Sequence, residues 1–506
     1  MESWLKPLFD AEGMRAVDRW AIEERGVDSL ELMEAAGRAV AEAVAGLAPE
    51  GPVRVVCGKG NNGGDGFVAA RLLREMGFEV AALMLWAGEE LRGDARVNFE
   101  RFGGELVEGG LAGRLARSGA VVDAIFGTGF EGVPREPAAA AIRAINGCGA
   151  PVVACDIASG VDASSGEVAG EAVEADVTVT FHAAKLGQRI APGKWRTGEL
   201  RVAPIGIPDG APAAAVGGEI DPDVLDLLPR RGAQSTKFSS GQVGVAGGSR
   251  GLTGAVRMTS LAAIRAGAGY ATVAVPADLN LVYEIAQPEV MSVACPGGDG
   301  CLVPASEKAV LPVFERAAAG VLGPGLGRDP GSFELARSLV GKIEVPLVID
   351  ADGLNAFAGR LGDLTARQPP TVLTPHAGEL GRLLERESGE IDAHRLAGAR
   401  EAARAAGAIL LLKGDDTIVT DGDRVAVNAL SAPALATAGS GDVLSGMTAA
   451  MLARGLEPFT AVCAAVVAHA RAGQEAARRV GVPESVIAGD VIEAIPSALR
   501  PDSRVE

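Results

Sequence analysis

Short apolar runs rich in valine and isoleucine alternate along the whole chain with alanine-rich helical stretches, and this alternation limits the possible folds more than any other feature. Such runs fit strands buried on both faces, and the stretches between them fit the helical crossovers that parallel strands require. The sequence therefore predicts an α/β fold. The strands predicted in the first half are Val53–Cys57, Val80–Leu85, Ala120–Phe126, Val152–Cys155 and Val177–Phe181, and the helices are Gly13–Glu24, Leu30–Gly46, Phe67–Met76 and Ala138–Ile145. The strands predicted in the second half are Val243–Ala246, Ala271–Val275, Gly320–Leu322, Leu347–Ile349, Thr371–Leu373 and Ile409–Leu412.

The length of 506 residues predicts two domains, because one hydrophobic core rarely serves a chain of this size. The stretch from Pro204 to Pro212, with the alanines and glycines that follow up to Gly218, is too rich in proline and glycine for a helix or a central strand. It is the best candidate for a linker. We therefore expect an N-terminal domain at residues 1–215 and a C-terminal domain at residues 222–506.

Composition excludes several classes of function. The formal net charge is −18 and no block of lysine or arginine stands out, which argues against binding to a nucleic-acid backbone. The N-terminus lacks the apolar core of a signal peptide, and the most apolar helical run, around Ala461 to Ala470, is too short to cross a bilayer. The six cysteines have neither metal-site spacing nor the pattern of a disulfide framework, so we expect a cytoplasmic protein.

Two glycine-rich segments place small residues where a backbone approaches an anion closely. The first, Asn61-Asn62-Gly63-Gly64-Asp65-Gly66, follows the strand Val53–Cys57 and is expected to form a turn. The second, Ala438-Gly439-Ser440-Gly441-Asp442, opens an apolar helical stretch. Each holds an aspartate beside backbone N–H donors. Because the two segments share neither spacing nor order, they predict two different nucleotide sites.

Three further polar clusters follow predicted strands of the first half. Asp123 precedes a glycine-rich segment beginning at Gly127, Asp156 begins the segment that ends at Asp162, and Lys185 follows the strand ending at Phe181. Taken singly, such glycines and aspartates are more often structural turn residues, and such a lysine is more often a solvated charge. Ligands of open parallel sheets, however, bind beyond the carboxyl ends of the strands. The joint occurrence of these clusters therefore favours a ligand site.

The second half has the same arrangement. Asp442 stands at the start of a helix, where it could accept a proton from a substrate hydroxyl during phosphoryl transfer. Polar or glycine-rich segments also follow four predicted strands: Gly323–Gly327, Asp350–Asn355, Thr374–Glu379 and Lys413–Thr417. A lone histidine such as His376 is more often structural, but its place among these segments indicates a ligand contact.

The first 215 residues resemble the NAD(P)H-hydrate epimerase domain, through the strings NNGGDG, GTGF-x-G-x-x-R and DIASGVD-x-x-x-G. That family interconverts the R and S epimers of hydrated NADH or NADPH at C6. The resemblance implies a Rossmann-like three-layer α/β/α fold, with Asp156 and Lys185 as catalytic residues. It implies a potassium ion bound by Asn62, Asp123 and Ser159, whose oxygens suit a hard cation. The substrate contacts that it implies are Asn61, Asn62, Gly63, Gly64, Asp65, Gly127, Thr128, Gly129, Phe130, Glu131, Gly132, Val133 and Asp156.

Residues from about Ser235 to Ile495 resemble the ribokinase-like fold and, within it, the ADP- or ATP-dependent NAD(P)H-hydrate dehydratase. The strings DADGLN, TPHAGE, LKG and AGSGD occur in the family order. The resemblance implies phosphorylation of the C6 hydroxyl, with Asp442 as the base and Mg²⁺ on the phosphates, and then loss of phosphate. The implied substrate contacts are Gly254, Gly325, His376 and Asp442, and the implied nucleotide contacts are Lys413, Gly414, Asp415, Asp416, Thr417 and Gly441.

These features together predict a bifunctional enzyme that repairs hydrated NADH and NADPH, and a homo-oligomer. Two departures from the family pattern, Ala158 in place of proline and Ser440 in place of threonine, remove no functional group. A first alternative is a ribokinase-type small-molecule kinase with a regulatory nucleotide-binding domain at its N-terminus. A second is an N-terminal half that has lost activity and serves as a binding module. The sequence does not distinguish ADP from ATP, or NADH from NADPH.

Overall fold

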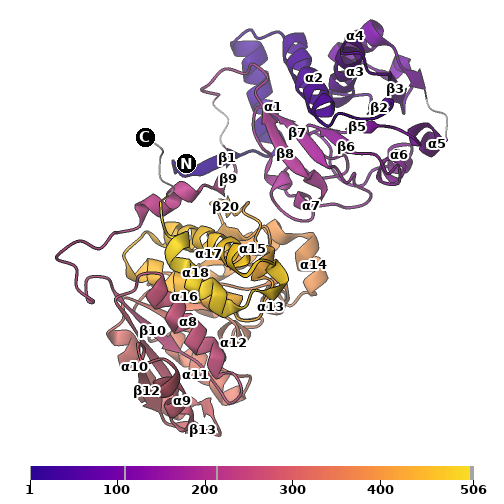
Figure 1. The fold of residues 1–506 in the computed structure, drawn as a ribbon. Helices are drawn as coiled ribbons and strands as arrows, with labels where there is room; N and C mark the ends of the chain where they lie inside the picture. The colour runs from indigo at the N-terminus through magenta and orange to yellow at the C-terminus, as the bar shows by residue number, and fades with distance from the viewer. Residues whose placement is uncertain (1, 107–109, 212–214, 502–506) are drawn as a thin grey trace. The chain divides into compact units, whose positions relative to one another are not determined.

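The structure, a computed structural model, describes residues 2–106, 110–211 and 215–501. The chain divides into two compact units, Pro7–Gly218 and Met1–Lys6 with Glu219–Glu506 (Figure 1). The first six residues were expected in the N-terminal domain. They belong to the C-terminal unit because Trp4 is buried in its core and the Trp4 carbonyl accepts a hydrogen bond from Asp221 N at 2.9 Å. Residues 212–214 of the predicted linker lie outside the described residues.

The N-terminal unit is built on a sheet of seven parallel strands. Their order across the sheet is β4 (Glu105–Leu106), β3 (Val80–Met84), β2 (Val53–Cys57), β5 (Ala120–Ala124), β6 (Val152–Cys155), β7 (Val177–Phe181) and β8 (Glu199–Ala203). From β2 the chain builds the sheet first in one direction and then, from β5, in the other. The gap between β2 and β5 is therefore the topological switch point at which ligands bind in open sheets.

Helices cover both faces of this sheet (Figure 1). Val55 of β2 packs in one core with α2 (Ser29–Gly46) and α3 (Asn61–Glu75), and its neighbour Val56 packs in a second core with α5 (Leu111–Leu115) and α6 (Ala138–Asn146). Successive side chains of a strand point to opposite faces, so one short apolar run supplies both cores. The remaining helices are α1 (Ala11–Arg19), which continues as a π-helical turn over Trp20–Glu24, α4 (Gly93–Phe102) and α7 (Lys194–Thr197). The predicted three-layer α/β/α arrangement is confirmed.

One local prediction in this unit is wrong. The segment Asn61–Gly66, expected to form a turn, is the first part of α3, and the helix begins six residues before the predicted Phe67. Its glycines serve close packing. A Cβ added to Gly63 would lie 2.0 Å from the Gly58 carbonyl oxygen, and one added to Gly66 would lie 2.6 Å from Ala124 Cβ. The helix start therefore lies directly against the ends of the strands.

The C-terminal unit contains a larger, mixed sheet. Seven neighbouring strands of this sheet, from Ile409–Leu412 at one end to Met291–Cys295 at the other, are parallel. Two further strands, Ile418–Thr420 and Val425–Val427, add an antiparallel hairpin that was not predicted from the sequence, because each has only three residues. The order is β1 (Leu5–Leu8), β9 (Gly217–Ile220), β20 (Val425–Val427), β19 (Ile418–Thr420), β18 (Ile409–Leu412), β17 (Thr371–Leu373), β16 (Leu347–Ile349), β15 (Ala319–Leu322), β10 (Gln242–Ala246), β11 (Tyr270–Pro276) and β12 (Met291–Cys295).

Helices also lie on both faces of this sheet. Val243 and Val245 of β10 share a core with α8 (Thr253–Arg265), α16 (Ser440–Ala453), α17 (Pro458–Val480) and α18 (Ala488–Ala498). On the opposite face, Phe314 of α10 (Glu307–Glu315) packs against Gly244 of β10, whose added Cβ would lie 3.3 Å from the ring. Among the described residues, no helix combines the length and apolar character needed to span a bilayer. The predicted α/β class is confirmed in this unit as well.

The packing of α3 generates a prediction about stability. Gly66→Ala should lower the free energy of unfolding of the N-terminal unit by about 1–3 kcal/mol, because its Cβ would overpack against Ala124. The measurement is the midpoint of chemical or thermal unfolding. The control is Gly113→Ala in α5, where an added Cβ meets no described atom within 4 Å and the midpoint should not fall. Equal midpoints for the two variants would contradict the packing role.

Candidate functional site

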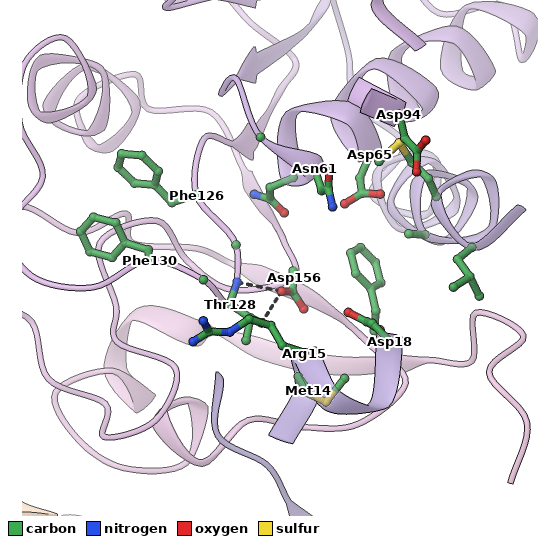
Figure 2. Close-up of a pocket in the computed structure, with 18 of the residues that line it drawn as sticks. Met14, Arg15, Asp18, Asn61, Asp65, Asp94, Phe126, Thr128, Phe130 and Asp156 are labelled. Atoms are coloured by element: carbon green, nitrogen blue, oxygen red, sulfur yellow. Dashed lines mark hydrogen bonds between the residues drawn. The ribbon is translucent and has the colours of Figure 1, made fainter. Parts of the chain in front are cut away.

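The N-terminal unit has a cavity of about 730 Å³ at the carboxyl ends of its strands (Figure 2). The segments after β2, β5, β6 and β7 supply Asn61, Gly127, Asp156 and Lys185, respectively. The convergence expected from the sequence is therefore present, and it lies at the switch point between β2 and β5. The predicted residues that line the cavity are Asn61, Asn62, Asp65, Gly127, Thr128, Gly129, Phe130, Glu131, Asp156 and Lys185.

Four of the predicted substrate contacts are not part of this lining: Gly63, Gly64, Gly132 and Val133. The two glycines are buried where α3 packs closely, and Val133 is exposed. The sequence analysis did not single out several residues that do line the cavity, among them Met14, Asp18, Met33, Lys59, Trp86 and Asp94. The side chains of Phe126 and Phe130 stack with ring centroids 4.6 Å apart, and both rings lie on one side of the cavity in Figure 2.

Asp156 and Lys185 form a buried ion pair at the base of this cavity, with Lys185 Nζ 2.6 Å from Asp156 Oδ1. Lys185 Nζ also donates to Thr180 Oγ1 at 2.7 Å and to the Phe181 carbonyl at 3.1 Å. Asp156 Oδ2 accepts from Thr128 N at 3.0 Å and from Thr128 Oγ1 at 2.5 Å. Burial alone would raise the pKa of Asp156, but the Lys185 charge and these hydrogen bonds hold that pKa below its ordinary value. The carboxylate is therefore ionised.

The backbone of Asp156 is held in an unusual conformation. Its φ of 67° lies in the left-handed region, which a residue with a Cβ rarely adopts. Asp156 N donates to the Val179 carbonyl at 2.8 Å, and the Asp156 carbonyl accepts from Gln188 Nε2 at 2.7 Å. Such strain persists only where the surroundings fix it, and it is most common at functional sites.

Of the three predicted potassium ligands, Asn62 lines the same cavity, whereas Asp123 and Ser159 are fully buried and do not. Asp123 Oδ1 accepts from Ser159 Oγ at 2.7 Å, and Asp123 Oδ2 accepts from Ser159 N at 2.8 Å. Burial raises the pKa of Asp123 to about 6 despite these hydrogen bonds. The amide oxygen and nitrogen of Asn62 are buried and have no hydrogen-bond partner among the described residues. A buried amide oxygen without a donor is costly, so this cluster is suited to a cation.

In the C-terminal unit the predicted segments also meet at the carboxyl ends of neighbouring strands, β15 to β18. The helix α16 begins at Ser440. The residue before it, Gly439, has a left-handed φ of 90°, which a glycine adopts without strain. Asp442 therefore lies in the first turn of α16, where backbone N–H groups point outward and favour negative charge. The arrangement is a helix N-terminus with free donors beside an aspartate.

Lys413 links the carboxylates of this site. Its Nζ lies 3.1 Å from Asp350 Oδ1 and 3.6 Å from Glu379 Oε2, and Ser445 Oγ donates to Asp350 Oδ2 at 2.7 Å. Burial lowers the pKa of Lys413, but the charges of Asp350 and Glu379 outweigh burial and raise it overall. Lys413 therefore remains charged. A Cβ added to Gly441 would lie 3.3 Å from Lys413 Nζ, so the ammonium group also borders the start of α16.

The carboxyl group of Asp442 has no fixed hydrogen-bond donor among the described residues. Its pKa is raised to about 7 overall, first by burial and then by the Asp350 charge, while Lys413 opposes the increase and Glu379 adds a smaller one. A carboxyl group with a pKa near neutrality can both accept and release a proton at physiological pH. Asp442 thus has the properties of a general base.

Of the other predicted substrate contacts, His376 lies close to the charges of Glu379 and Lys413. His376 caps α13 (Ala377–Leu384), because its Nδ1 accepts from Gly378 N at 3.0 Å, and burial lowers its pKa. Nδ1 is therefore unprotonated, and Nε2 carries the hydrogen that a ligand could accept. Gly325 has a φ of 59°, and an added Cβ there would lie 2.5 Å from the Leu252 carbonyl oxygen. At Gly254 an added Cβ would meet no described atom closer than 4.0 Å.

The segment Lys413–Thr417 combines exposed and buried residues. Asp416 is buried in an ion pair with Arg395 of α15 (Arg395–Ala406), with Arg395 Nη2 2.7 Å from Asp416 Oδ1. Gly414 lies against the same guanidinium group: a Cβ added to Gly414 would lie 2.3 Å from Arg395 Nη2. Thr417 Oγ1 donates to the Gly414 carbonyl at 2.7 Å, and Asp415 is exposed. In this structure Asp416 and Thr417 shape the turn, whereas Asp415 is exposed, with its Oδ1 accepting from Ser431 Oγ at 2.8 Å, and Lys413 is half-buried.

Two family models match the chain. Residues 29–187 match the YjeF-related protein N-terminus, and residues 243–497 match a model described as NAD(P)H-hydrate dehydratase. The first match contains Asp65, Asp123, Asp156 and Lys185, and the second contains Lys413 and Asp442. The ion pairs of both sites therefore lie inside the matched regions, whereas the α1 residues that line the N-terminal cavity precede the first match.

Relatives match over nearly the full length. A bifunctional NAD(P)H-hydrate repair enzyme of Moorella thermoacetica is 40% identical over 97% of this chain and 96% of its own. The enzyme of the same name from Salinibacter ruber is 37% identical over 98% of this chain and 96% of its own. A solved structure of the ADP/ATP-dependent NAD(P)H-hydrate dehydratase of Bacillus subtilis, co-crystallised with ATP and Mg²⁺, is 27% identical over 54% of this chain and 94% of its own, with a TM-score of 0.47. The full-length identity to these relatives shows that the chain belongs to the family of bifunctional NAD(P)H-hydrate repair enzymes.

Proposed function

We propose that this chain repairs hydrated NADH and NADPH in two reactions on two units. The N-terminal unit interconverts the R and S epimers at C6, and the C-terminal unit dehydrates the S epimer at the expense of ADP or ATP. The observation that carries this proposal is the presence, in a chain with full-length repair-enzyme relatives, of two separate sites that each contain a lysine–aspartate pair. Spontaneous hydration yields both epimers, so an epimerase supplies the dehydratase with the form it accepts.

In the C-terminal unit, Asp442 accepts the proton of the C6 hydroxyl, which then attacks the terminal phosphorus of the nucleotide. Lys413 and the free N–H groups at the start of α16 stabilise the charge that develops on the transferred group. Phosphate then leaves C6 while C5 loses a proton to solvent, and the electrons of that C–H bond form the C5=C6 double bond of the dihydronicotinamide. Phosphate is a far better leaving group than hydroxide, which explains why the reaction consumes a nucleotide.

Mg²⁺ fits the charges of this site. Asp350, Glu379 and Asp442 surround a single cation, Lys413, so a further positive charge would be stabilised there. No group of three or more His, Cys, Asp or Glu side chains in the described parts of the chain is arranged to hold a metal alone. We therefore infer that Mg²⁺ binds with the nucleotide phosphates and one or two of these carboxylates, and that it would neutralise phosphate charge when bound.

In the N-terminal unit, Asp156 is the proton-transfer residue, and Lys185 keeps it ionised. Potassium fits the nearby cluster, because the unpartnered Asn62 amide, the Asp123 carboxyl and the Ser159 hydroxyl offer three kinds of oxygen ligand. The ion would offset the cost of burying Asp123 and would fix the loops that follow β5 and β6.

The residue roles predict that Asp442→Asn abolishes dehydration and spares epimerisation. Loss of the base should lower kcat for nucleotide-dependent recovery of the reduced nicotinamide by about 10²–10⁴-fold. Absorbance of the dihydronicotinamide measures the first activity, and chromatographic separation of the epimers measures the second. A stable phosphorylated product from the wild-type chain would instead support the small-molecule kinase alternative.

The pKa of Asp442 predicts the pH dependence of dehydration. The base must be ionised, so kcat/KM should rise through about pH 7 and level off above it. Glu379→Gln removes a negative charge that raises the pKa of Asp442. The midpoint of the pH profile of this variant should therefore lie at lower pH than that of the wild type. Glu387→Gln, an exposed position, is the matched control and should leave the midpoint unchanged. A midpoint insensitive to Glu379 would argue against Asp442 as the titrating base.

Asp156→Asn should abolish enzymatic epimerisation and spare dehydration of the S epimer, so that the R epimer is consumed only through its spontaneous exchange. Because the variant leaves Lys185 charged and buried, it should also destabilise the N-terminal unit by about 3–5 kcal/mol. The double variant Asp156→Asn with Lys185→Met removes both charges and should recover most of that stability. Recovery of exchange together with stability would show that the carboxylate has no chemical role.

Three sequence predictions accompany this proposal: a homo-oligomer, a cytoplasmic location, and the use of either ADP or ATP. All six cysteines are free, as expected for a reducing compartment. Light scattering of the purified chain and a comparison of rates with the two nucleotides are the direct tests.

A further inference from the structure

Helix α1 presents one side to the cavity of the N-terminal unit. Met14, Asp18 and Ile22 follow one another at intervals of four residues, and all three line that cavity. Asp18 is thus a carboxyl group between two apolar residues on the side of α1 that faces a ligand site, and Arg15 of the same helix also lines the cavity. In Figure 2 the carboxyl groups of Asp18, Asp65 and Asp156 point into the same space from α1, from α3 and from the segment after β6.

These three carboxyl groups differ in their surroundings. Asp156 is saturated, because Lys185 Nζ and Thr180 Oγ1 contact Oδ1 while the amide and hydroxyl of Thr128 donate to Oδ2. Within the described parts of the chain, no residue hydrogen-bonds to the side chain of Asp18, which remains partly accessible through the cavity. The carboxyl group of Asp18 is therefore free to contact a bound substrate.

Inversion at C6 requires proton transfer on two faces of the ring. As the C6–O bond breaks, the leaving hydroxyl takes a proton from an acid and departs as water, while the lone pair of the ring nitrogen forms the N1=C6 bond. Water then adds to the opposite face, the N1=C6 electrons return to nitrogen, and a base takes the surplus proton. One proton has then passed from the acid to the base, and the two groups exchange it back through the cavity. A single carboxylate saturated by hydrogen bonds does not supply both transfers.

We propose that Asp18 is a second catalytic residue of the epimerase site and works with Asp156 as an acid–base pair. The assignment rests on the epimerase activity proposed above and adds a residue that lies before the matched family region, residues 29–187. In one direction Asp18 protonates the leaving hydroxyl and Asp156 receives the proton of the incoming water. In the other direction the roles reverse.

The charges around Asp18 suit this role. Its pKa is raised to about 6 overall, first by burial and then by the negative charge of Asp156, while Lys185 opposes the increase. Asp65, the third carboxyl of the cavity, has a pKa far above its ordinary range, owing first to burial and then to the charges of Asp156, Asp18 and Asp94. The protonated form of Asp65 is therefore favoured, whereas Asp18 is the group whose pKa allows it to gain and lose a proton near physiological pH.

The test uses the full-length chain without nucleotide, so that only epimerisation occurs. Starting from the purified R epimer of hydrated NADH, chromatography follows the appearance of the S epimer, with the spontaneous rate subtracted. Asp18→Asn should lower kcat by about 10²–10⁴-fold with KM changed less than about threefold. The active pair carries one proton, so wild-type kcat/KM should fall above about pH 6, and Asp18→Asn should lose this dependence. Asp18→Glu should restore part of the rate and of the pH dependence.

Glu12→Gln, on the exposed side of α1, is the matched control and should behave as wild type. Exchange within threefold of wild type in Asp18→Asn would overturn the assignment, and so would an unchanged fall in rate above pH 6. An Asp18→Glu variant as inactive as Asp18→Asn would do the same. A wild-type chain with no exchange above the spontaneous rate would instead overturn the epimerase function itself.

Discussion

A lysine–aspartate ion pair, buried in the N-terminal unit and partly buried in the C-terminal unit, organises each of the two sites. Lys185 and Asp156 are 2.6 Å apart in the N-terminal unit, and Lys413 and Asp350 are 3.1 Å apart in the C-terminal unit. In the N-terminal unit Lys185 holds the pKa of Asp156 below its ordinary value. In both units the negative charge of the paired aspartate helps to raise the pKa of a second carboxyl group, Asp18 or Asp442. The fixed pair thus prepares a neighbouring group for proton transfer near neutral pH.

The parallel strands explain why these groups meet at all. Each lysine and aspartate follows a different strand, and the carboxyl ends of adjacent parallel strands lie at one edge of a sheet. The residues come from positions far apart in the sequence, such as Asp350 and Lys413. They meet because β16, β17 and β18 pair in parallel register, which brings the ends of these strands together. The fold therefore supplies the geometry, and the segments after the strands supply the chemistry.

Sequence reasoning predicted most strands and the elements that carry both sites, because buried strands and glycine-rich segments have strong local signals. It failed where the tertiary environment decides. The glycines of Asn61–Gly66 indicated a turn, yet close packing against Gly58 and Ala124 makes them part of α3. Asp416 gave no local sign of its buried pairing with Arg395. Asp18 had a weak signal, a charge between two apolar residues on one side of a helix, and only the position of α1 gives that charge a cavity to face.

The central claim is that one chain converts both epimers of the hydrated dinucleotide to the reduced form, with one nucleotide cleaved per molecule repaired. The most direct measurement incubates the wild-type chain with an R and S mixture of hydrated NADH, Mg²⁺ and either ADP or ATP, and follows both the dihydronicotinamide absorbance and the phosphate released. The account predicts complete recovery of NADH, faster than spontaneous epimerisation allows, with one phosphate per NADH. Recovery that stops at the S fraction, or nucleotide consumption without NADH, would contradict it.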